Sequence, residues 1–116
     1  MNVNSNGYVK KSVVFDDILK VIKEKYAEVI RIRRFSFLNT SGLMDVKYQV
    51  EDRTYTGEIY FNEVYKEDYE YTEMNSPHVF LSMRGYGAPD IIHGIVKEFG
   101  GCFAVNQHKL KEMVKY

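Results

Sequence analysis

Two adjacent stretches of this chain alternate apolar and polar residues, and this alternation constrains the fold more than any other feature of the sequence. The apolar members of the first stretch are Met44, Val46, Tyr48 and Val50. Those of the second stretch are Tyr55, Ile59 and Phe61. A period of two places successive side chains on opposite faces of a β-strand. The intervening residues 51–53 are short enough for a turn, so the two stretches predict an antiparallel pair of strands.

The preceding segment, IRIRRFSFL, also alternates, but its phase changes partway. Ile30 and Ile32 share one face, whereas Phe35 and Phe37 share the other. A β-bulge near residues 33–34 would reconcile the two halves. The three segments together predict an antiparallel meander.

Apolar residues at three- and four-residue steps predict two amphipathic helices. The first runs from Ser12, a suitable N-cap, to about Ile30. The second runs from Pro89 to Phe99 and ends at a pair of glycines. A fourth strand ends at Arg84 and a short fifth one covers residues 102–105, after which we expect a last helix beginning at Asn106 and reaching Val114.

The predicted order is α-β-β-β-β-α-β-α, which indicates an α+β fold. We expect a single two-layer domain over residues 12–116, with a four- or five-stranded, mostly antiparallel sheet and helices packed on one face. Residues 1–11 are polar and aperiodic, so we expect a flexible N-terminal segment. The opposite sheet face would be solvated or would bind a partner. Its predicted residues are Lys47, Gln49, Thr56, Glu58, Tyr60, Phe80 and Arg84.

The formal net charge is zero, from 16 basic and 16 acidic residues, which argues against a polyanion binder held by bulk charge. The charges are nevertheless segregated. Residues 1–34 carry eight basic and four acidic side chains (+4), residues 45–73 three and nine (−6), and residues 84–116 five and three (+2). The acidic middle of the chain favours a basic partner.

The acidic middle also contains a tyrosine-rich stretch, which we expect to form a long loop over residues 63–76. Tyrosine supplies contact area with few rotamers to freeze, and carboxylates match a basic surface. The candidate partner-binding residues are Tyr60, Glu63, Tyr65, Glu67, Asp68, Tyr69, Glu70 and Tyr71. The sequence thus predicts a small non-enzymatic protein-binding domain, an inhibitor or immunity-like factor of phage or mobile-element origin that docks on a larger protein. An ordinary solvated loop is the alternative interpretation of this stretch.

A second predicted function is small-ligand or nucleotide binding at the turn over residues 85–90. The residues of this alternative site are Arg84, Gly85, Gly87 and His93. Backbone N–H groups at a helix start can bind phosphate, but Pro89 lacks that donor and Asp90 repels an anion. The turn therefore favours a plain strand-to-helix connection. Basic residues around positions 31–34 leave nucleic acid as a further, less favoured partner.

Residue types for catalysis or metal binding do not occur at useful spacings. His78, His93 and His108 are far apart, and neither CxxC nor HxxxH occurs, so we expect no metal and no cofactor. Cys102 lies in an apolar run and predicts a buried thiol rather than a nucleophile. The sequence therefore favours a protein that is not an enzyme.

Other features bear on location and assembly. The chain has one cysteine, no apolar stretch long enough to span a membrane and no apolar segment typical of a signal peptide. We therefore expect a cytoplasmic protein without a membrane partner. Frequent Lys, Asn, Ile and Tyr are typical of an AT-rich bacterial or phage genome. An unpaired sheet edge would also allow a homodimer.

Overall fold

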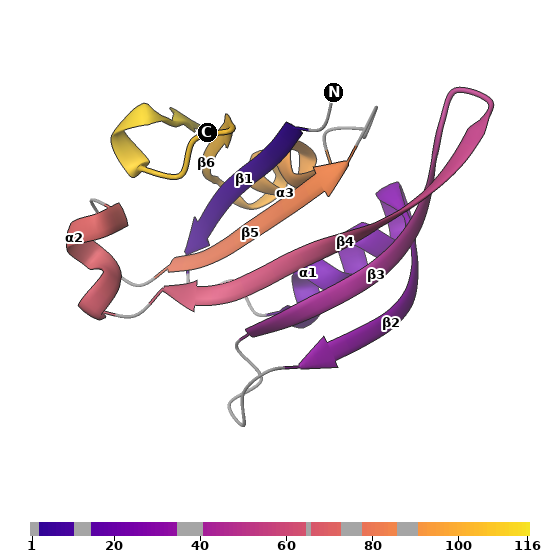
Figure 1. Cartoon of the computed structure of the whole chain (residues 1–116), viewed down its shortest axis with the longest axis horizontal. Coiled ribbons are helices and arrows are strands. Elements are labelled where there is room, and N and C mark those ends of the chain that lie inside the picture. The colour runs from indigo at the N-terminus through magenta and orange to yellow at the C-terminus, as the bar shows by residue number, and fades with distance from the viewer. Residues whose placement is uncertain (1–2, 11–14, 35–40, 65, 73–77, 86–90) are drawn as a thin grey trace.

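The computed structural model is built around one antiparallel sheet and describes residues 3–10, 15–34, 41–64, 66–72, 78–85 and 91–116 (Figure 1). The strands are β1 (Val3–Lys10), β2 (Glu28–Arg34), β3 (Ser41–Val50), β4 (Arg53–Val64), β5 (His78–Gly85), β6 (Gly101–Val105) and β7 (Val114–Lys115). The α-helices are α1 (Phe15–Val21), α2 (Tyr69–Thr72) and α3 (Ile91–Phe99). The π-helical turn is η1 (Ile22–Tyr26), and the two 3-10 turns are η2 (Lys66–Asp68) and η3 (Leu110–Glu112). None of the helices in these ranges has the length and apolar character needed to traverse a lipid bilayer.

Within the described residues the sheet has seven strands in the order β2-β3-β4-β5-β1-β6-β7, and all neighbours pair antiparallel. The prediction of four or five strands with the helices on one face is therefore wrong. The two additional strands are β1, whose sequence is mostly polar, and β7, which is only two residues long. The helix α2 lies beyond the end of β4, away from α1 and α3 (Figure 1).

The strands β2, β3 and β4 form the predicted antiparallel meander. In the turn between β3 and β4, Glu51 adopts a φ of 56°. A bulge is present in β2, but it lies between Val29 and Arg31 rather than near residues 33–34. It places Ile32 beside Met44 and Arg31 beside Asp45. Phe35 and Phe37, which suggested the later position, lie outside the described residues.

Residues 3–10 are not a flexible segment, because they form the strand β1 between β5 and β6. Their polar side chains have partners in the fold. Ser82 Oγ donates to Asn6 Oδ1 at 2.8 Å, and Asn6 Nδ2 donates to the Gln107 carbonyl at 2.7 Å. Gly7 allows α3 to approach closely, since a Cβ there would lie 2.7 Å from Val96 Cγ2. Internal hydrogen bonding and close helix packing explain why a polar, aperiodic segment occupies a central strand.

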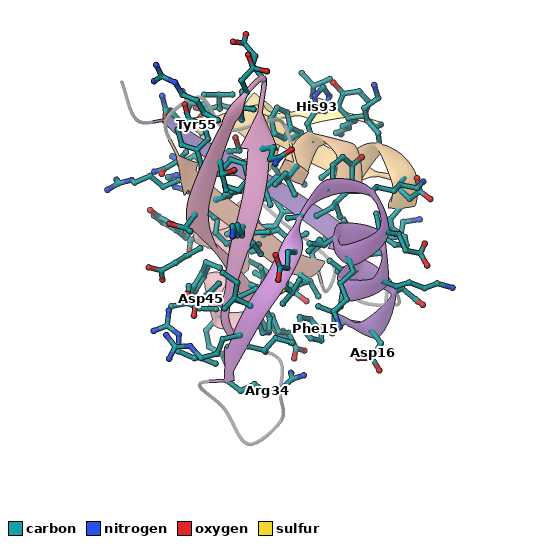
Figure 2. The ribbon with its side chains drawn as sticks, turned by 90° about the vertical axis from the view of Figure 1, so that its right-hand side faces the viewer. Phe15, Asp16, Arg34, Asp45, Tyr55 and His93 are labelled. Atoms are coloured by element: carbon teal, nitrogen blue, oxygen red, sulfur yellow. The ribbon has the colours of Figure 1, made fainter. Side chains whose placement is uncertain are left out.

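The helices α1 and α3 lie on the same face of the sheet (Figures 1 and 2). Fully buried residues from these helices and from the strands form the main core: Ile18, Ile22, Met44, Val46, Ile59, Phe61, Leu81, Ile92 and Val96. At one end of this layer the Arg34 guanidinium carbon lies 4.7 Å from the centre of the Phe15 ring (Figure 2). We call the other side of the sheet the open face.

Two helix predictions need correction. The first helix does not reach Ile30, because α1 continues as the π-helical turn η1 and the chain extends into β2 at Glu28. The last segment forms η3 and β7 instead of a helix from residue 106 to 114. Asn106 does not cap a helix there. It adopts a φ of 60°, and its N–H donates to the Asn4 carbonyl at 2.8 Å, which ties the C-terminal segment to β1.

A second, smaller core lies on the open face under α2 and the C-terminal segment. Its buried members are Tyr8, Val64, Cys102 and Met113, and Tyr69, Phe80 and Leu110 pack against it. The open face is therefore covered at one end and accessible elsewhere. This arrangement positions the two hollows described below.

Candidate functional site

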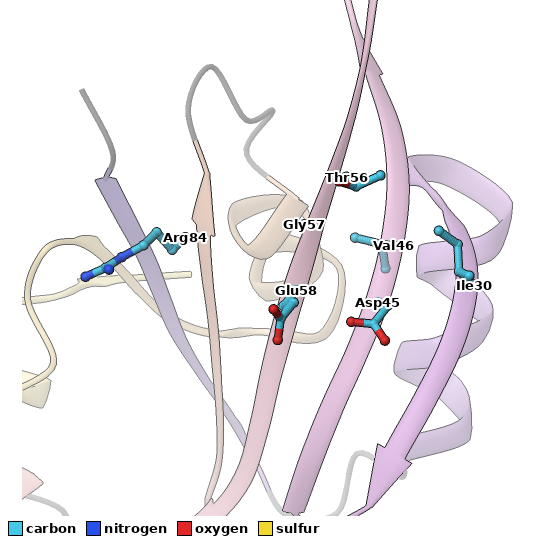
Figure 3. Close-up of a pocket in the computed structure, with 7 residues that line it drawn as sticks. All are labelled: Ile30, Asp45, Val46, Thr56, Gly57, Glu58 and Arg84. Atoms are coloured by element: carbon cyan, nitrogen blue, oxygen red, sulfur yellow. The ribbon is translucent and has the colours of Figure 1, made fainter.

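The accessible part of the open face carries a row of polar residues across five strands. Cross-strand pairing aligns Arg31, Asp45, Glu58, Arg84 and Asn4. Lys47, Gln49, Thr56, Tyr60 and Phe80 alternate on the same face, so the predicted residues of this face are confirmed. A shallow hollow of about 580 Å³ lies along this row and is also lined by Ile30 and Thr56 (Figure 3).

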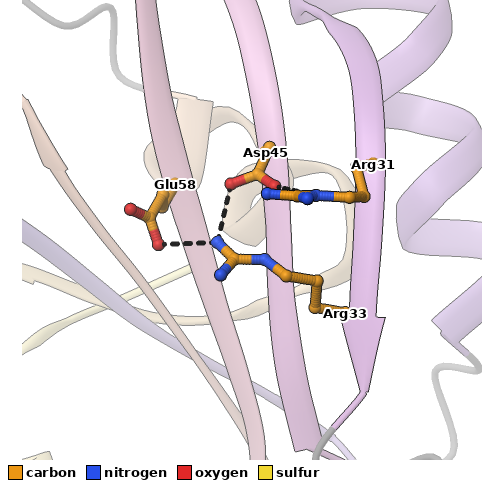
Figure 4. A network of polar contacts seen from close by, with 4 residues as sticks. All are labelled: Arg31, Arg33, Asp45 and Glu58. Carbon is orange, nitrogen blue, oxygen red and sulfur yellow. Dashed lines mark hydrogen bonds and ion pairs between the residues drawn. The ribbon is translucent and has the colours of Figure 1, made fainter.

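Asp45 is the centre of an ion-pair network in this row (Figure 4). Its Oδ2 accepts a hydrogen bond from Arg31 Nε at 2.9 Å, and its Oδ1 accepts one from Arg33 Nη2 at 2.8 Å. The same Arg33 nitrogen donates to Glu58 Oε2 at 3.2 Å. The hydrogen bond from Arg31, together with Arg33, holds the pKa of Asp45 below its ordinary value of 3.8.

These contacts limit the chemistry of the polar hollow. Asp45 is held ionised and its two oxygens are occupied by arginines, so it is poorly suited to act as a general acid or base. Arg84 extends toward β1, where its Nε donates to Asn4 Oδ1 at 3.1 Å (Figure 3). The charged groups of the polar row are therefore engaged with one another and with Asn4.

An aromatic pocket of about 300 Å³ lies at the covered end of the open face. Its rings belong to Tyr8, Tyr60, Tyr71, Phe80 and His108. Asn62, Val64 and Thr72 complete the lining. Five segments thus meet at one concave site: β1, the consecutive elements β4, α2 and β5, and the C-terminal segment.

The side chain of His108 connects this pocket to the exposed surface. Its ring stacks on Tyr71 with the ring centres 4.8 Å apart and the planes 20° apart. Its backbone carbonyl accepts a hydrogen bond from the Tyr8 hydroxyl at 2.7 Å. Within the described part of the chain, His108 Nε2 is buried and has no hydrogen-bond partner. Tyr71 is 64% exposed, so the stack joins a surface tyrosine to the lining of the pocket.

The predicted partner-binding residues are distributed between the interior and the surface. Tyr60 lines the aromatic pocket, Glu63 is buried at the end of β4, and Tyr69 packs against the second core. The backbone of Asp68 belongs to η2, and Tyr65 lies outside the described residues. The exposed members are Glu67, Glu70 and Tyr71. The stretch is therefore not one loop that displays all its tyrosines.

The residues of the predicted alternative site do not come together. Arg84 lies on the open face. His93 belongs to α3 on the opposite face, where its ring stacks on Phe103 with the ring centres 4.4 Å apart. His93 Nε2 is also 2.7 Å from the Tyr116 hydroxyl. Gly85 ends β5, and Gly87 lies outside the described residues. Arg84 and His93 consequently cannot line one ligand pocket.

Sequence reasoning missed five of the residues that line the aromatic pocket, namely Tyr8, Asn62, Val64, Thr72 and His108. Tyr8 and His108 were not connected with the tyrosine-rich stretch, because their elements were expected to be a flexible segment and a helix. Asn62 follows Tyr60 by two residues in β4, so its place on the same face could have been inferred from the alternation. The contacts among β1, α2 and the C-terminal segment have no comparable local signal.

Two further observations concern the reactive and metal-binding residue types in the described part of the chain. Cys102 is buried in the second core as predicted, and burial raises the pKa of its thiol. Among the described residues, no three His, Cys, Asp or Glu side chains gather closely enough to hold a metal ion. No protein-family model, curated protein or solved structure matches this chain at a significant level.

Proposed function

We propose that this chain is a non-enzymatic binding protein that docks on a larger protein through its α2 surface, defined as Tyr71 with the exposed carboxylates Glu67 and Glu70. The observation that carries the proposal is the stacking of an exposed tyrosine, Tyr71, on His108. A side chain that is already held in place loses little conformational freedom when a partner binds. Tyrosine is also enriched among the residues that dominate binding energy at interfaces.

Charge supports a basic region on the partner. Glu67 and Glu70 lie on the same short helical segment as Tyr71. The α2 surface therefore presents two exposed carboxylates beside a tyrosine, and such a surface would favour a partner with a basic region. Docking that covers a basic cleft of the partner would make this chain an inhibitor or an immunity-like factor.

A cytoplasmic location is part of the same proposal. The chain has one cysteine, and its thiol is buried and unpaired. A protein without disulfides suits a reducing compartment.

The β2 edge of the sheet bears on assembly with a second copy. The bulge in β2 and its exposed arginine, Arg31, disfavour strand pairing with a second copy at this edge.

Affinity capture with matched variants tests the docking surface. Wild-type protein, Tyr71→Ala, the double variant Glu67→Lys/Glu70→Lys and the control Ile30→Ala would be immobilised and exposed to an extract of the native host. Ile30 is a suitable control because it is also an exposed apolar residue, at 56%, but lies in β2. Circular dichroism and thermal unfolding would establish that each variant is folded.

We expect wild type and Ile30→Ala to retain the same larger protein. Tyr71→Ala should weaken its capture by at least about tenfold, which corresponds to about 1.4 kcal/mol. The charge-reversed variant should also weaken capture, most strongly at low salt. Equal capture by wild type and folded Tyr71→Ala would contradict the proposal.

A further inference from the structure

The aromatic pocket is built mainly from ring faces and edges. Phe80 lies between two tyrosines, with its ring centre 5.0 Å from that of Tyr8 and 6.3 Å from that of Tyr60. The stacked pair Tyr71 and His108 forms a second group of rings. The volume of about 300 Å³ is at the low end of the range of small-molecule sites. A pocket of this size and lining suits a compact, flat ligand.

Two residues of this lining have polar groups whose hydrogen-bonding capacity is unused within the described part of the chain. His108 Nε2 is buried without a partner in the described part of the chain, although buried polar atoms in proteins are usually hydrogen-bonded. Asn62 Oδ1 accepts a hydrogen bond from Ser41 Oγ, which leaves the amino group Nδ2 as a donor. A ligand with hydrogen-bonding groups on its edge would bond to the Asn62 amino group, and a rotation of the His108 ring toward the pocket would bring Nε2 to the same ligand.

The absence of charged side chains among the lining residues described limits the class of ligand further. None of the described residues that line the pocket is Lys, Arg, Asp or Glu, so neither an anion nor a cation would meet an opposite charge there. A saturated lipid chain would leave His108 Nε2 without a hydrogen bond. We propose that the pocket binds an uncharged planar heteroaromatic ring of nucleobase size, a role that goes beyond docking on a protein.

Such a ring could come from a free nucleoside or from a base of a single-stranded nucleic acid. Aromatic side chains stack on bases in both cases. On the same open face Arg31 is paired with Asp45, whereas the exposed Arg84 could contact a phosphate of a strand that continues beyond the pocket. The two sources share the ring chemistry and differ in their dependence on salt.

Titrations followed by two-dimensional NMR of the full chain test the proposal. The probes are adenosine, guanosine, cytidine and uridine, with ribose as the ring-free control, and short single-stranded oligonucleotides of the same bases. The variant His108→Phe keeps a ring against Tyr71 and keeps the backbone carbonyl that accepts from Tyr8, but lacks Nε2. Tyr60→Leu provides a second variant that removes a ring. His93→Phe, on the opposite face, is the matched control.

We expect at least one nucleoside, but not ribose, to shift the amide signals of Tyr60, Phe80 and His108. Its affinity should fall about tenfold in His108→Phe and in Tyr60→Leu and stay unchanged in His93→Phe. Similar affinities for nucleosides and oligonucleotides would identify a free heterocycle, whereas tighter, salt-sensitive binding of oligonucleotides would identify a base within a strand. The proposal is overturned if no probe shifts these signals, if ribose shifts them equally, or if both pocket variants bind as wild type does.

Discussion

The centre of the His108 ring lies 4.8 Å from the centre of the Tyr71 ring, and the two ring planes are 20° apart. This contact joins α2 to the C-terminal segment. The same histidine is fixed to the central strand β1, because its carbonyl accepts the Tyr8 hydroxyl at 2.7 Å. An exposed residue of a short helix is thereby supported by the interior of the sheet.

The first prediction concerns the contribution of this stack to stability. Tyr71→Ala should lower the free energy of unfolding by about 0.5–1.5 kcal/mol, because it removes the ring contact with His108. Tyr71→Phe keeps the ring and should stay close to wild type. Urea denaturation measures both variants. A Tyr71→Ala midpoint equal to that of wild type would show that the stack contributes nothing to stability.

The second prediction concerns acid stability and Asp45. Arg31 and Arg33 lower the pKa of this carboxyl in the folded protein below its ordinary value of 3.8. The stabilisation that these two arginines give the folded protein is therefore fully present above pH 3.8. It is lost as the pH falls through the lowered pKa of Asp45. Asp45→Asn should be less stable than wild type at about pH 6, and the difference should vanish toward about pH 2.

Urea midpoints measured across that pH range test this dependence. Asp52→Asn, in the exposed turn between β3 and β4, serves as the control for the removal of one carboxylate. A difference between wild type and Asp45→Asn that does not depend on pH would exclude the ion pairs as its cause.

The third prediction concerns the packing of α3 on β1. A Cβ at Gly7 would lie 2.7 Å from Val96 Cγ2 and 2.9 Å from Ile92 Cγ2. Gly7→Ala should therefore displace the helix and destabilise the fold by roughly 1–3 kcal/mol in thermal or urea unfolding. Gly57→Ala is the control, because its nearest neighbour is the flexible end of Met83 at 3.2 Å. Greater destabilisation by Gly57→Ala than by Gly7→Ala would contradict this packing.

The fourth prediction concerns Cys102. Burial raises the pKa of its thiol and also limits access to it. The reactive thiolate should therefore be scarce at neutral pH, and alkylation by iodoacetamide should be much slower than for free cysteine. Unfolding in urea should remove most of this difference. Alkylation of the folded protein at the rate of free cysteine would be inconsistent with a buried thiol.

The meander and the two sheet faces could be predicted because their signal is local. Alternation in β3 and β4 places Met44 and Ile59 on one face and Asp45 and Glu58 on the other, and the observed pairing agrees. Gly100, with a φ of 77°, ends α3 as its position after the apolar repeat indicates. These features depend on backbone geometry within a few residues.

The second core and the aromatic pocket could not be predicted, because they depend on contacts between distant segments. Asn6 and Tyr8 suit an interior strand only when Gln107 and His108 accept their hydrogen bonds. The N–H of Asn106 likewise donates to the carbonyl of residue 4, at the other end of the chain. The sequence of either terminal segment alone shows no pattern that predicts these long-range contacts.

Site-specific photocrosslinking tests the docking surface most directly. A benzophenone amino acid would replace Tyr71 in one variant and Ile30 in the other, and both would be irradiated in the native host. We predict a covalent adduct with one larger protein at position 71, absent at position 30 and weakened by Glu67→Lys/Glu70→Lys. An adduct with that protein at position 30 but none at position 71 would contradict docking through the α2 surface.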